Sequence, residues 1–209
     1  AYSLAKWLDF ATISLDGPEE MHDRVRGKGS FRKALKGLEL LRKEGVRVGV
    51  NMVILPENIG YLREFIEWLR DRVDYVTMQP VHPPQKVDGI SELVEYLLRL
   101  KDEIPRLIPL SKSYIVGIPK FLEGNFEKIC DAGRLYFSVS PRGEVLACGA
   151  RNDLVLGNML EEELDEILAP ERVNRVVGLC RGCWLECTAG VSLAFRRPDV
   201  LSYVKLLKR

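Results

Sequence analysis

The first eighty residues alternate between short apolar segments and helix-like segments, and this pattern limits the chain to a few folds. The apolar segments, rich in β-branched residues, end at turn or proline signals and cover 10–14, 46–55 and 75–78. Between and after them, large apolar residues recur at helical spacing, which predicts helices that begin near Ser30, Asn58 and Ser91. Apolar strands joined by helices favour a parallel sheet with right-handed crossovers. We therefore predict an α/β fold.

The second half of the chain has a different character. Leu135, Phe137 and Val139 alternate with polar residues, the segment 140–143 has a turn signature, and an apolar run then leads to Cys148. This pattern predicts a β-hairpin that brings its two ends close together. We also predict short helices over 121–129 and 160–168, and a basic helix at the end of the chain. We therefore predict that the second half of the chain forms a small hairpin-plus-helix unit.

All five cysteines lie in the last eighty residues, at positions 130, 148, 180, 183 and 187. Cys180 and Cys183 form a Cys-x2-Cys pair, which lets two thiolates of one turn bind the same centre and reduces the loop-closure entropy. Zinc and a [4Fe–4S] cluster both accept four thiolates, and local spacing does not choose between them. Disulfides with one free thiol are a further alternative. The layout predicts a sulfur-rich metal centre.

Composition bears on partners and location. The net charge of +1 gives no electrostatic case for a nucleic-acid partner or a membrane surface. No apolar run approaches the roughly 20 residues that span a bilayer. Clustered cysteines that stay reduced are typical of metal-binding or redox proteins of the cytosol, so we predict a cytoplasmic protein with no membrane or nucleic-acid partner.

The first half resembles part of the radical S-adenosylmethionine (SAM) enzymes. Residues 10–18, followed by 22–27 and 29–31, look like the fourth strand and the next loop of that superfamily. The following helix, residues 45–48 and the strand that carries Asn51 continue the resemblance. The resemblance implies a (β/α)6 partial TIM barrel, of which this chain would supply the C-terminal half.

The second half resembles the SPASM/twitch extension of the same superfamily. That extension begins with Cys, a variable run and Gly-x4-Cys, and here Cys130 is followed by twelve residues, Gly143, four residues and Cys148. The pair Gly157-Asn158 and the later Cys-x2-Cys also match. The full SPASM pattern has seven cysteines, so this chain looks like the shorter twitch type with one auxiliary [4Fe–4S] cluster, because five thiolates cannot supply eight ligands. The implied ligands are four of Cys130, Cys148, Cys180, Cys183 and Cys187.

The resemblance also implies division of the chain into two domains. Residues 1–118 would be the C-terminal half of the barrel, and residues 119–209 the Cys-rich domain with its C-terminal helix. The Cys-x3-Cys-x2-Cys motif that binds the SAM-cleaving cluster is absent from the 209 residues. The expectation is therefore a C-terminal portion whose missing N-terminal half carries SAM and a second [4Fe–4S] cluster.

Four residues are implied to face the SAM pocket. Ser14, Asp16 and Asn51 lie at strand ends, where parallel barrels place their sites, and Arg26 would pair with an anionic group such as the SAM carboxylate. The alternatives are that Ser14 and Asp16 shape the turn and that Arg26 is a solvated loop charge. Asn51 is the hardest to dismiss, because a buried amide needs partners.

Other conspicuous residues have simpler interpretations. His22 and His82 are interpreted as structural or solvated. Trp184, between two cysteines, is interpreted as shielding a site. Residues 196–197 and 205–209 are interpreted as the solvated basic face of a helix.

The implied function is that of a radical SAM oxidoreductase or maturase. The complete enzyme would use a 5′-deoxyadenosyl radical and an auxiliary cluster to modify a peptide or a small cofactor precursor, and it would need a reductant protein. The fragment by itself is not expected to be active. The alternative is a non-enzymatic, four-cysteine zinc-binding scaffold or a split-enzyme subunit.

Overall fold

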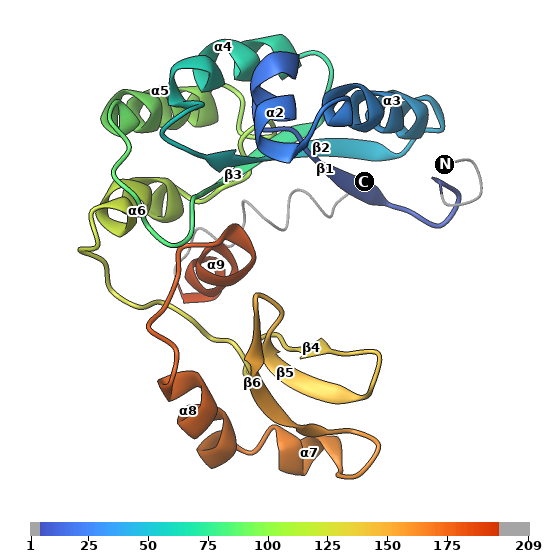
Figure 1. The fold of residues 1–209 in the computed structure, drawn as a ribbon, viewed down its shortest axis with the longest axis vertical. Helices are drawn as coiled ribbons and strands as arrows, with labels where there is room; N and C mark the ends of the chain where they lie inside the picture. The colour runs from blue at the N-terminus through green and yellow to red at the C-terminus, as the bar shows by residue number, and fades with distance from the viewer. Residues whose placement is uncertain (1–4, 197–209) are drawn as a thin grey trace.

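The larger sheet of the protein has three parallel strands in the order β1-β2-β3 (Figure 1). The structure is a computed structural model that describes residues 5–196. The strands are β1 (Phe10–Ser14), β2 (Arg47–Ile54) and β3 (Tyr75–Pro80). The accompanying helices are α2 (Glu19–Arg26), α3 (Ser30–Lys43), α4 (Ile59–Leu69), α5 (Ile90–Glu103) and α6 (Lys112–Leu122). These elements confirm the predicted mixed α/β fold with a parallel sheet.

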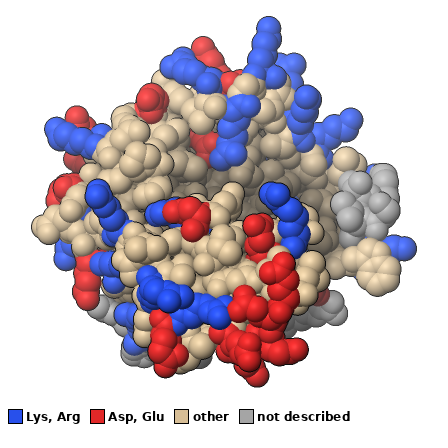
Figure 2. Space-filling model, turned by 60° about the horizontal axis from the view of Figure 1, so that its bottom comes forward, with Lys and Arg blue, Asp and Glu red and all other residues tan. Residues whose placement is uncertain are grey.

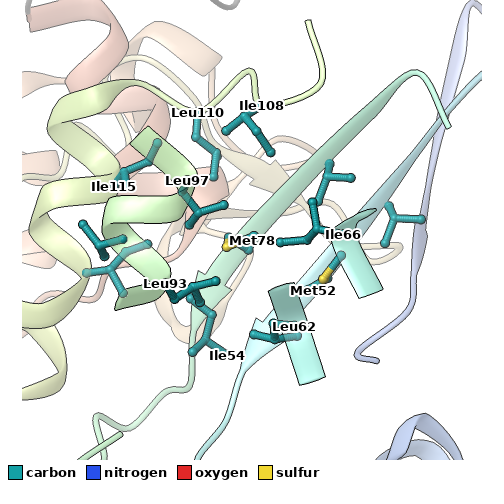
Figure 3. Close-up of a cluster of buried hydrophobic side chains, with 14 of the residues drawn as sticks. Met52, Ile54, Leu62, Ile66, Met78, Leu93, Leu97, Ile108, Leu110 and Ile115 are labelled. Carbon is teal, nitrogen blue, oxygen red and sulfur yellow. The ribbon is translucent and has the colours of Figure 1, made fainter. Parts of the chain in front are cut away.

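One face of this sheet is buried beneath helices, which Figure 1 shows on its upper side. Alternate residues of β2, among them Val50 and Met52, point to this face and are fully buried. Met52 packs with Met78 of β3 and Ile66 of α4 (Figure 3). Full burial of a side chain of this size contributes about 1.5–3 kcal/mol, so this layer holds the sheet and its helices together.

The opposite face of the sheet is polar. Thr12, Gly49 and Tyr75 share one register across the three strands, and the Thr12 Oγ1 lies 2.6 Å from the Tyr75 hydroxyl. A Cβ atom on Gly49 would lie 2.1 Å from the Tyr75 ring. Glycine at this position therefore lets the ring lie across the middle strand. Ser14, two residues after Thr12, lies on the same face.

A second, antiparallel sheet is built from the second half of the chain. It contains β4 (Ser138–Val139), β5 (Glu144–Cys148) and β6 (Arg151–Asn158) in that order. The turn between β4 and β5 closes where Gly143 donates to the Ser140 carbonyl, and Gly143 has a φ of +82° that favours glycine. Helices α7 (Leu164–Ile167) and α8 (Pro170–Gly178) follow. The predicted hairpin is therefore present, and a third strand extends it.

The acidic residues near α7 lie at one end of the molecule. The segment contains Glu161, Glu162, Glu163, Asp165 and Glu166. Figure 2, in which the lower end of Figure 1 comes forward, shows acidic side chains gathered in one part of this face. Arg172 of α8 binds one of them, Glu162, at 2.6 Å. The acidic run is thus a surface feature that also fastens α7 to α8.

The described residues form two hydrophobic clusters, a larger one at the parallel sheet and a smaller one at the second sheet. After the second sheet, the chain returns to the larger cluster. The smaller cluster includes Val145, Leu154 and Val173 of the second sheet and α8. Trp184 and Leu193 follow that unit in sequence, yet they belong to the larger cluster of the parallel sheet. Leu193 lies on α9 (Val191–Arg196), which comes directly after a π-helical turn, Glu186–Gly190. The end of the described chain therefore packs on the first half of the molecule.

The predicted helix over 121–129 is wrong. The helix in this region is α6, which begins after Ser111, whose hydroxyl accepts a hydrogen bond from the Tyr114 backbone at 3.1 Å. Pro119 lies inside α6 and removes one backbone donor, but Tyr114 and Phe121 on the same helix are almost fully buried. Burial of this apolar face outweighs the proline, and Gly124 with φ +75° follows the end of the helix.

The prediction for 160–168 is correct only in part, because α7 covers 164–167 alone. Strand β6 was not predicted, although Leu154 and Leu156 are buried and alternate with exposed residues, a period-two signal. Helices α3 and α5 form as expected, but their first residues follow Gly29 and Gly89 and not a serine cap. No helix in the described part of the chain is long and apolar enough to cross a membrane.

Candidate metal centre

The five cysteines come from two separate stretches of the chain. Cys130 precedes the hairpin and Cys148 ends β5, while Cys180 and Cys183 follow α8 and Cys187 lies in the π-helical turn. All five thiols are free. Cys148 is buried, Cys187 is exposed, and the other three are partly buried.

The hairpin and the distal turn meet at the smaller hydrophobic cluster. Cys148 is a member of this cluster, and Cys130 and Cys180 pack against it. The Lys128 ammonium group donates to the backbone carbonyls of Val177 and Cys180, each at 2.7 Å. The segment that leads into Cys130 is thereby fastened to the segment that leads into Cys180. The structure therefore brings the two groups of thiols to one region.

The protonation behaviour of the thiols reflects this grouping. Burial raises the pKa of Cys148, and the nearby thiols of Cys183, Cys130 and Cys180 raise it further. Protein atoms crowd the Cys187 thiol although the residue keeps accessible surface, and this crowding raises its pKa to about 11, with Glu186 adding to the effect. The neutral thiols of Cys148 and Cys187 are therefore favoured unless a cation stabilises their thiolates.

Several polar groups lie at hydrogen-bonding distance from the sulfurs. The Tyr136 hydroxyl is 3.6 Å from Cys130 Sγ, and the Thr188 hydroxyl is 3.0 Å from Cys183 Sγ. Cys180 Sγ accepts from the Gly182 backbone N–H at 3.4 Å and from Arg151 Nη1 at 3.7 Å. Such groups orient thiolate ligands and tune the metal they hold. None of these four residues was predicted; Gly182 lies inside the Cys-x2-Cys turn, whereas Tyr136, Arg151 and Thr188 occupy no position that the cysteine motifs define.

The thiols fit a cluster-binding site in the chemistry of their donor set. Five sulfurs, partial burial and N–H donors to sulfur suit a site with four thiolate ligands. Among residues 5–196, however, no group of three or more His, Cys, Asp or Glu side chains is disposed to hold a metal ion. Binding of a single zinc ion would therefore require movement of the side chains, whereas the ligands of a [4Fe–4S] cluster lie farther apart than those of one ion.

Two of the residues predicted at the SAM pocket lie side by side on the polar face of the larger sheet. Ser14 and Asn51 are register partners, and Thr77 is the partner of Asn51 on the next strand. The Thr77 hydroxyl donates to Asn51 Oδ1 at 3.0 Å. Thr77 was missed, although it is the polar residue of an otherwise apolar strand segment. The three side chains form a polar row across the sheet, and their role toward SAM stays a prediction.

The other two, Asp16 and Arg26, bind each other. Asp16 is fully buried and forms an ion pair with the Arg26 guanidinium. The same carboxylate accepts from the Val53 backbone N–H at 2.8 Å, and the Asn58 side chain donates to the Asp16 carbonyl at 2.9 Å. In this structure Arg26 is therefore engaged within the protein, and Asp16 organises the loop after β1.

His22 and Arg196 also have defined structural roles. His22 is buried and its Nδ1 accepts from the Asp16 backbone N–H at 3.1 Å, which agrees with the structural interpretation. Arg196 is exposed on α9, in agreement with the predicted solvated helical face, and it also forms a two-pronged ion pair with Asp131. The pair ties α9 to the residue after Cys130. Residues 197 and 205–209 lie outside the described residues.

We expect the pH dependence of stability to report on His22. Burial lowers the pKa of His22 below its ordinary value of 6.5, against an opposing effect of Asp16. The unfolded state then binds more protons as the pH falls below about 6.5, so the free energy of unfolding decreases until the folded pKa is passed. Denaturant unfolding at pH 7.5 and 5.5 should show a smaller decrease in His22→Gln than in wild type. Equal decreases in wild type and His22→Gln would contradict this contribution of His22.

Two models of known protein families match parts of the chain. Residues 2–69 match the family model of the radical SAM superfamily, and residues 130–187 match that of SPASM, an iron–sulfur cluster-binding domain. The second match begins at Cys130 and ends at Cys187, so it contains all five cysteines. The chain belongs to the radical SAM superfamily and carries a SPASM domain, a combination that implies SAM binding and iron–sulfur clusters.

Individual relatives agree with this class. The chain is 27% identical to mycofactocin maturase MftC of Mycolicibacterium smegmatis over 193 residues, 82% of this chain and 49% of that protein. It is 22% identical to sporulation killing factor maturation protein SkfB of Bacillus subtilis over 194 residues, 90% of this chain and 46% of that protein. The solved structure of native anSMEcpe with bound AdoMet has the same fold, with a TM-score of 0.59 at 18% identity over 86% of this chain and 56% of that one. The chain spans about half the length of these maturases.

Proposed function

We propose that this chain is the C-terminal part of a radical SAM maturase that modifies a peptide or a cofactor precursor. The observation that carries the proposal is that thiols from the hairpin and from the distal turn share one hydrophobic cluster. The similarity to MftC, a mycofactocin maturase, and to SkfB, a maturation protein, supports the reaction class. The N-terminal half, the substrate and a reductant protein are partners that the proposal requires. A reducing cytoplasm is the compartment in which five free thiols would persist.

The parallel sheet fits the role of a barrel half in this proposal. Its helices cover one face, and its polar face carries Ser14 at the end of β1, with Asn51 and Thr77 beside it within β2 and β3. In barrels of parallel strands the C-terminal strand ends form the site, so these three side chains would contact SAM or substrate. Residues 1–118 would form the barrel half and 119–209 the cluster domain, with α6 spanning the boundary.

The auxiliary [4Fe–4S] cluster would be held by Cys130, Cys148, Cys180 and Cys183. The first three meet at the smaller hydrophobic cluster. Among the thiols, Cys183 has the largest effect in raising the pKa of Cys148. Cys187, exposed in the π-helical turn, would be the additional thiol. The bound cluster supplies one-electron chemistry or a substrate ligand position. The protein would keep the cluster close to the barrel through the packing of Trp184 on α6.

Anaerobic reconstitution with iron and sulfide tests this proposal. We expect a brown protein with absorption near about 400 nm and about four iron atoms per chain. Cys148→Ala should abolish this absorption, whereas Cys187→Ala should keep it. A colourless protein that binds one zinc ion per chain, in wild type and in Cys187→Ala, would favour the zinc-binding scaffold instead.

A further inference from the structure

Arg151 connects a carboxylate to one of the candidate ligand sulfurs. Its Nε donates to Asp153 Oδ1 at 2.7 Å, and its Nη2 donates to the other oxygen of the same carboxylate. The remaining nitrogen, Nη1, lies 3.7 Å from Cys180 Sγ. Two edges of one planar guanidinium group are thus occupied at the same time, which fixes its orientation.

The backbone places Arg151 close to the other thiols as well. Arg151 opens β6 and is the register partner of Cys148 at the tight connection from β5. The thiols of Cys180 and Cys148 both raise the pKa of Arg151, after the larger effect of Asp153. Of the groups found at hydrogen-bonding distance from a cysteine sulfur within residues 5–196, Arg151 is the one that carries a formal charge.

We propose that Arg151, oriented by Asp153, is a positioning residue that raises the reduction potential of the auxiliary cluster. The proposal rests on the proposed function, because it requires a cluster bound to Cys180. Reduction adds one electron to the centre and involves no bond change, and a cation beside a ligand sulfur stabilises the added negative charge. An N–H donor to the sulfur acts in the same direction. Asp153 lies on the far side of the guanidinium, and its negative charge opposes this effect.

The two partners therefore have effects of opposite sign, which a merely structural role would not produce. In the reconstituted full chain, Arg151→Gln should lower the ratio of reduced to oxidised cluster about tenfold at a fixed solution potential, equivalent to a midpoint shift of about 59 mV for one electron. Asp153→Asn removes a negative charge and should shift the midpoint upward by a smaller amount. The midpoint is measured by titration with dithionite, followed by the electron paramagnetic resonance signal of the reduced cluster.

Two further variants make the test decisive. Arg142→Gln removes the same charge from an exposed turn position with no side-chain contact to a thiol, and it should leave the midpoint unchanged. Arg151→Lys keeps the charge without the planar fork and should retain more than half of the upward effect. If Arg151→Gln does not bind a cluster, the comparison of Arg151→Lys and Asp153→Asn with wild type still requires shifts of opposite sign.

The possible outcomes separate this inference from the proposed function. Failure of the wild-type chain to assemble any cluster would refute the proposed function. A normal cluster whose midpoint moves no further in Arg151→Gln than in Arg142→Gln would refute the inference alone. Shifts of the same sign in Arg151→Gln and Asp153→Asn would also refute it, because both substitutions would then act through loosened packing.

Discussion

Replacement of Trp184 by alanine is expected to lower the free energy of unfolding by about 3–5 kcal/mol, even without metal. The Trp184 ring is buried, stacks on Tyr114 at a centroid distance of 6.0 Å, and fills the space above Gly117. A Cβ on Gly117 would lie 1.9 Å from this ring, so the helix and the indole are in close contact. Truncation leaves a large cavity between α6 and the distal cysteine turn.

Polar contacts add to this anchor. Trp184 Nε1 donates to the Tyr114 carbonyl at 3.0 Å, and the Tyr114 hydroxyl donates to the Trp184 carbonyl at 2.9 Å. Trp184→Phe should therefore show a smaller loss than Trp184→Ala, because it keeps a ring but removes one donor. Trp184 therefore also has a structural role beyond the predicted shielding of a site. Its packing on α6 holds the neighbouring Cys183 close to the first half of the molecule.

Denaturant unfolding of the full chain measures the effect. Trp7 provides the matched control, because 77% of its surface is exposed and Trp7→Ala should change stability by no more than about 0.5 kcal/mol. Equal losses for the two alanine variants would contradict the packing described for Trp184. If Trp184→Ala also binds less iron per chain after reconstitution, the result would further indicate that Trp184 positions the distal thiols.

We expect the second large effect from Asp16→Ala, a loss of about 3 kcal/mol in the free energy of unfolding. The substitution leaves the Arg26 guanidinium without its partner and the Val53 N–H without its acceptor. The value lies at the low end for a broken buried ion pair, because 36% of the Arg26 side chain is exposed. Asp16→Asn should lose less, since an amide oxygen can still accept from Val53.

The surface ion pair between Arg32 and Glu19 serves as the control. Both side chains are largely exposed, at 78% and 43%, so Glu19→Ala should change stability by less than about 1 kcal/mol. A loss for Asp16→Ala no larger than that for Glu19→Ala would show that the buried pair does not hold the loop after β1. The experiment needs no SAM, so it separates the structural role of Asp16 from any role in binding.

The local pattern predicted the parallel sheet because short apolar strands alternate with amphipathic helices along the chain. The helices after residues 30, 58 and 91 followed from apolar spacing, and Gly45 with φ +81° follows the end of α3. Strand β6 and the true position of α6 did not follow, because Gly157 and Pro119 interrupt their patterns. In both cases burial of apolar side chains against other elements overrides the local signal.

The candidate site divides in a similar way. Cys spacing within one turn and across one hairpin is local information, so the sequence alone indicated a sulfur-rich centre and its family. Arg151 reaches the Cys180 sulfur only because β6 and the segment after α8 meet in space, whereas Tyr136 and Thr188 contact sulfurs five or six residues away in sequence. Likewise, Arg26 carries a charge that sequence analysis assigned to a ligand, whereas tertiary packing supplies Asp16 as its partner.

The sequence by itself therefore determined the class of the protein, the parallel sheet and the thiols available to a metal. Only the tertiary structure decided which polar groups face those thiols and which charges are already paired. The physical reason is that periodicity and motif spacing report contacts between residues close in the chain. Hydrogen bonds and ion pairs between distant segments, such as Arg151 with Cys180, depend on the packing of whole elements.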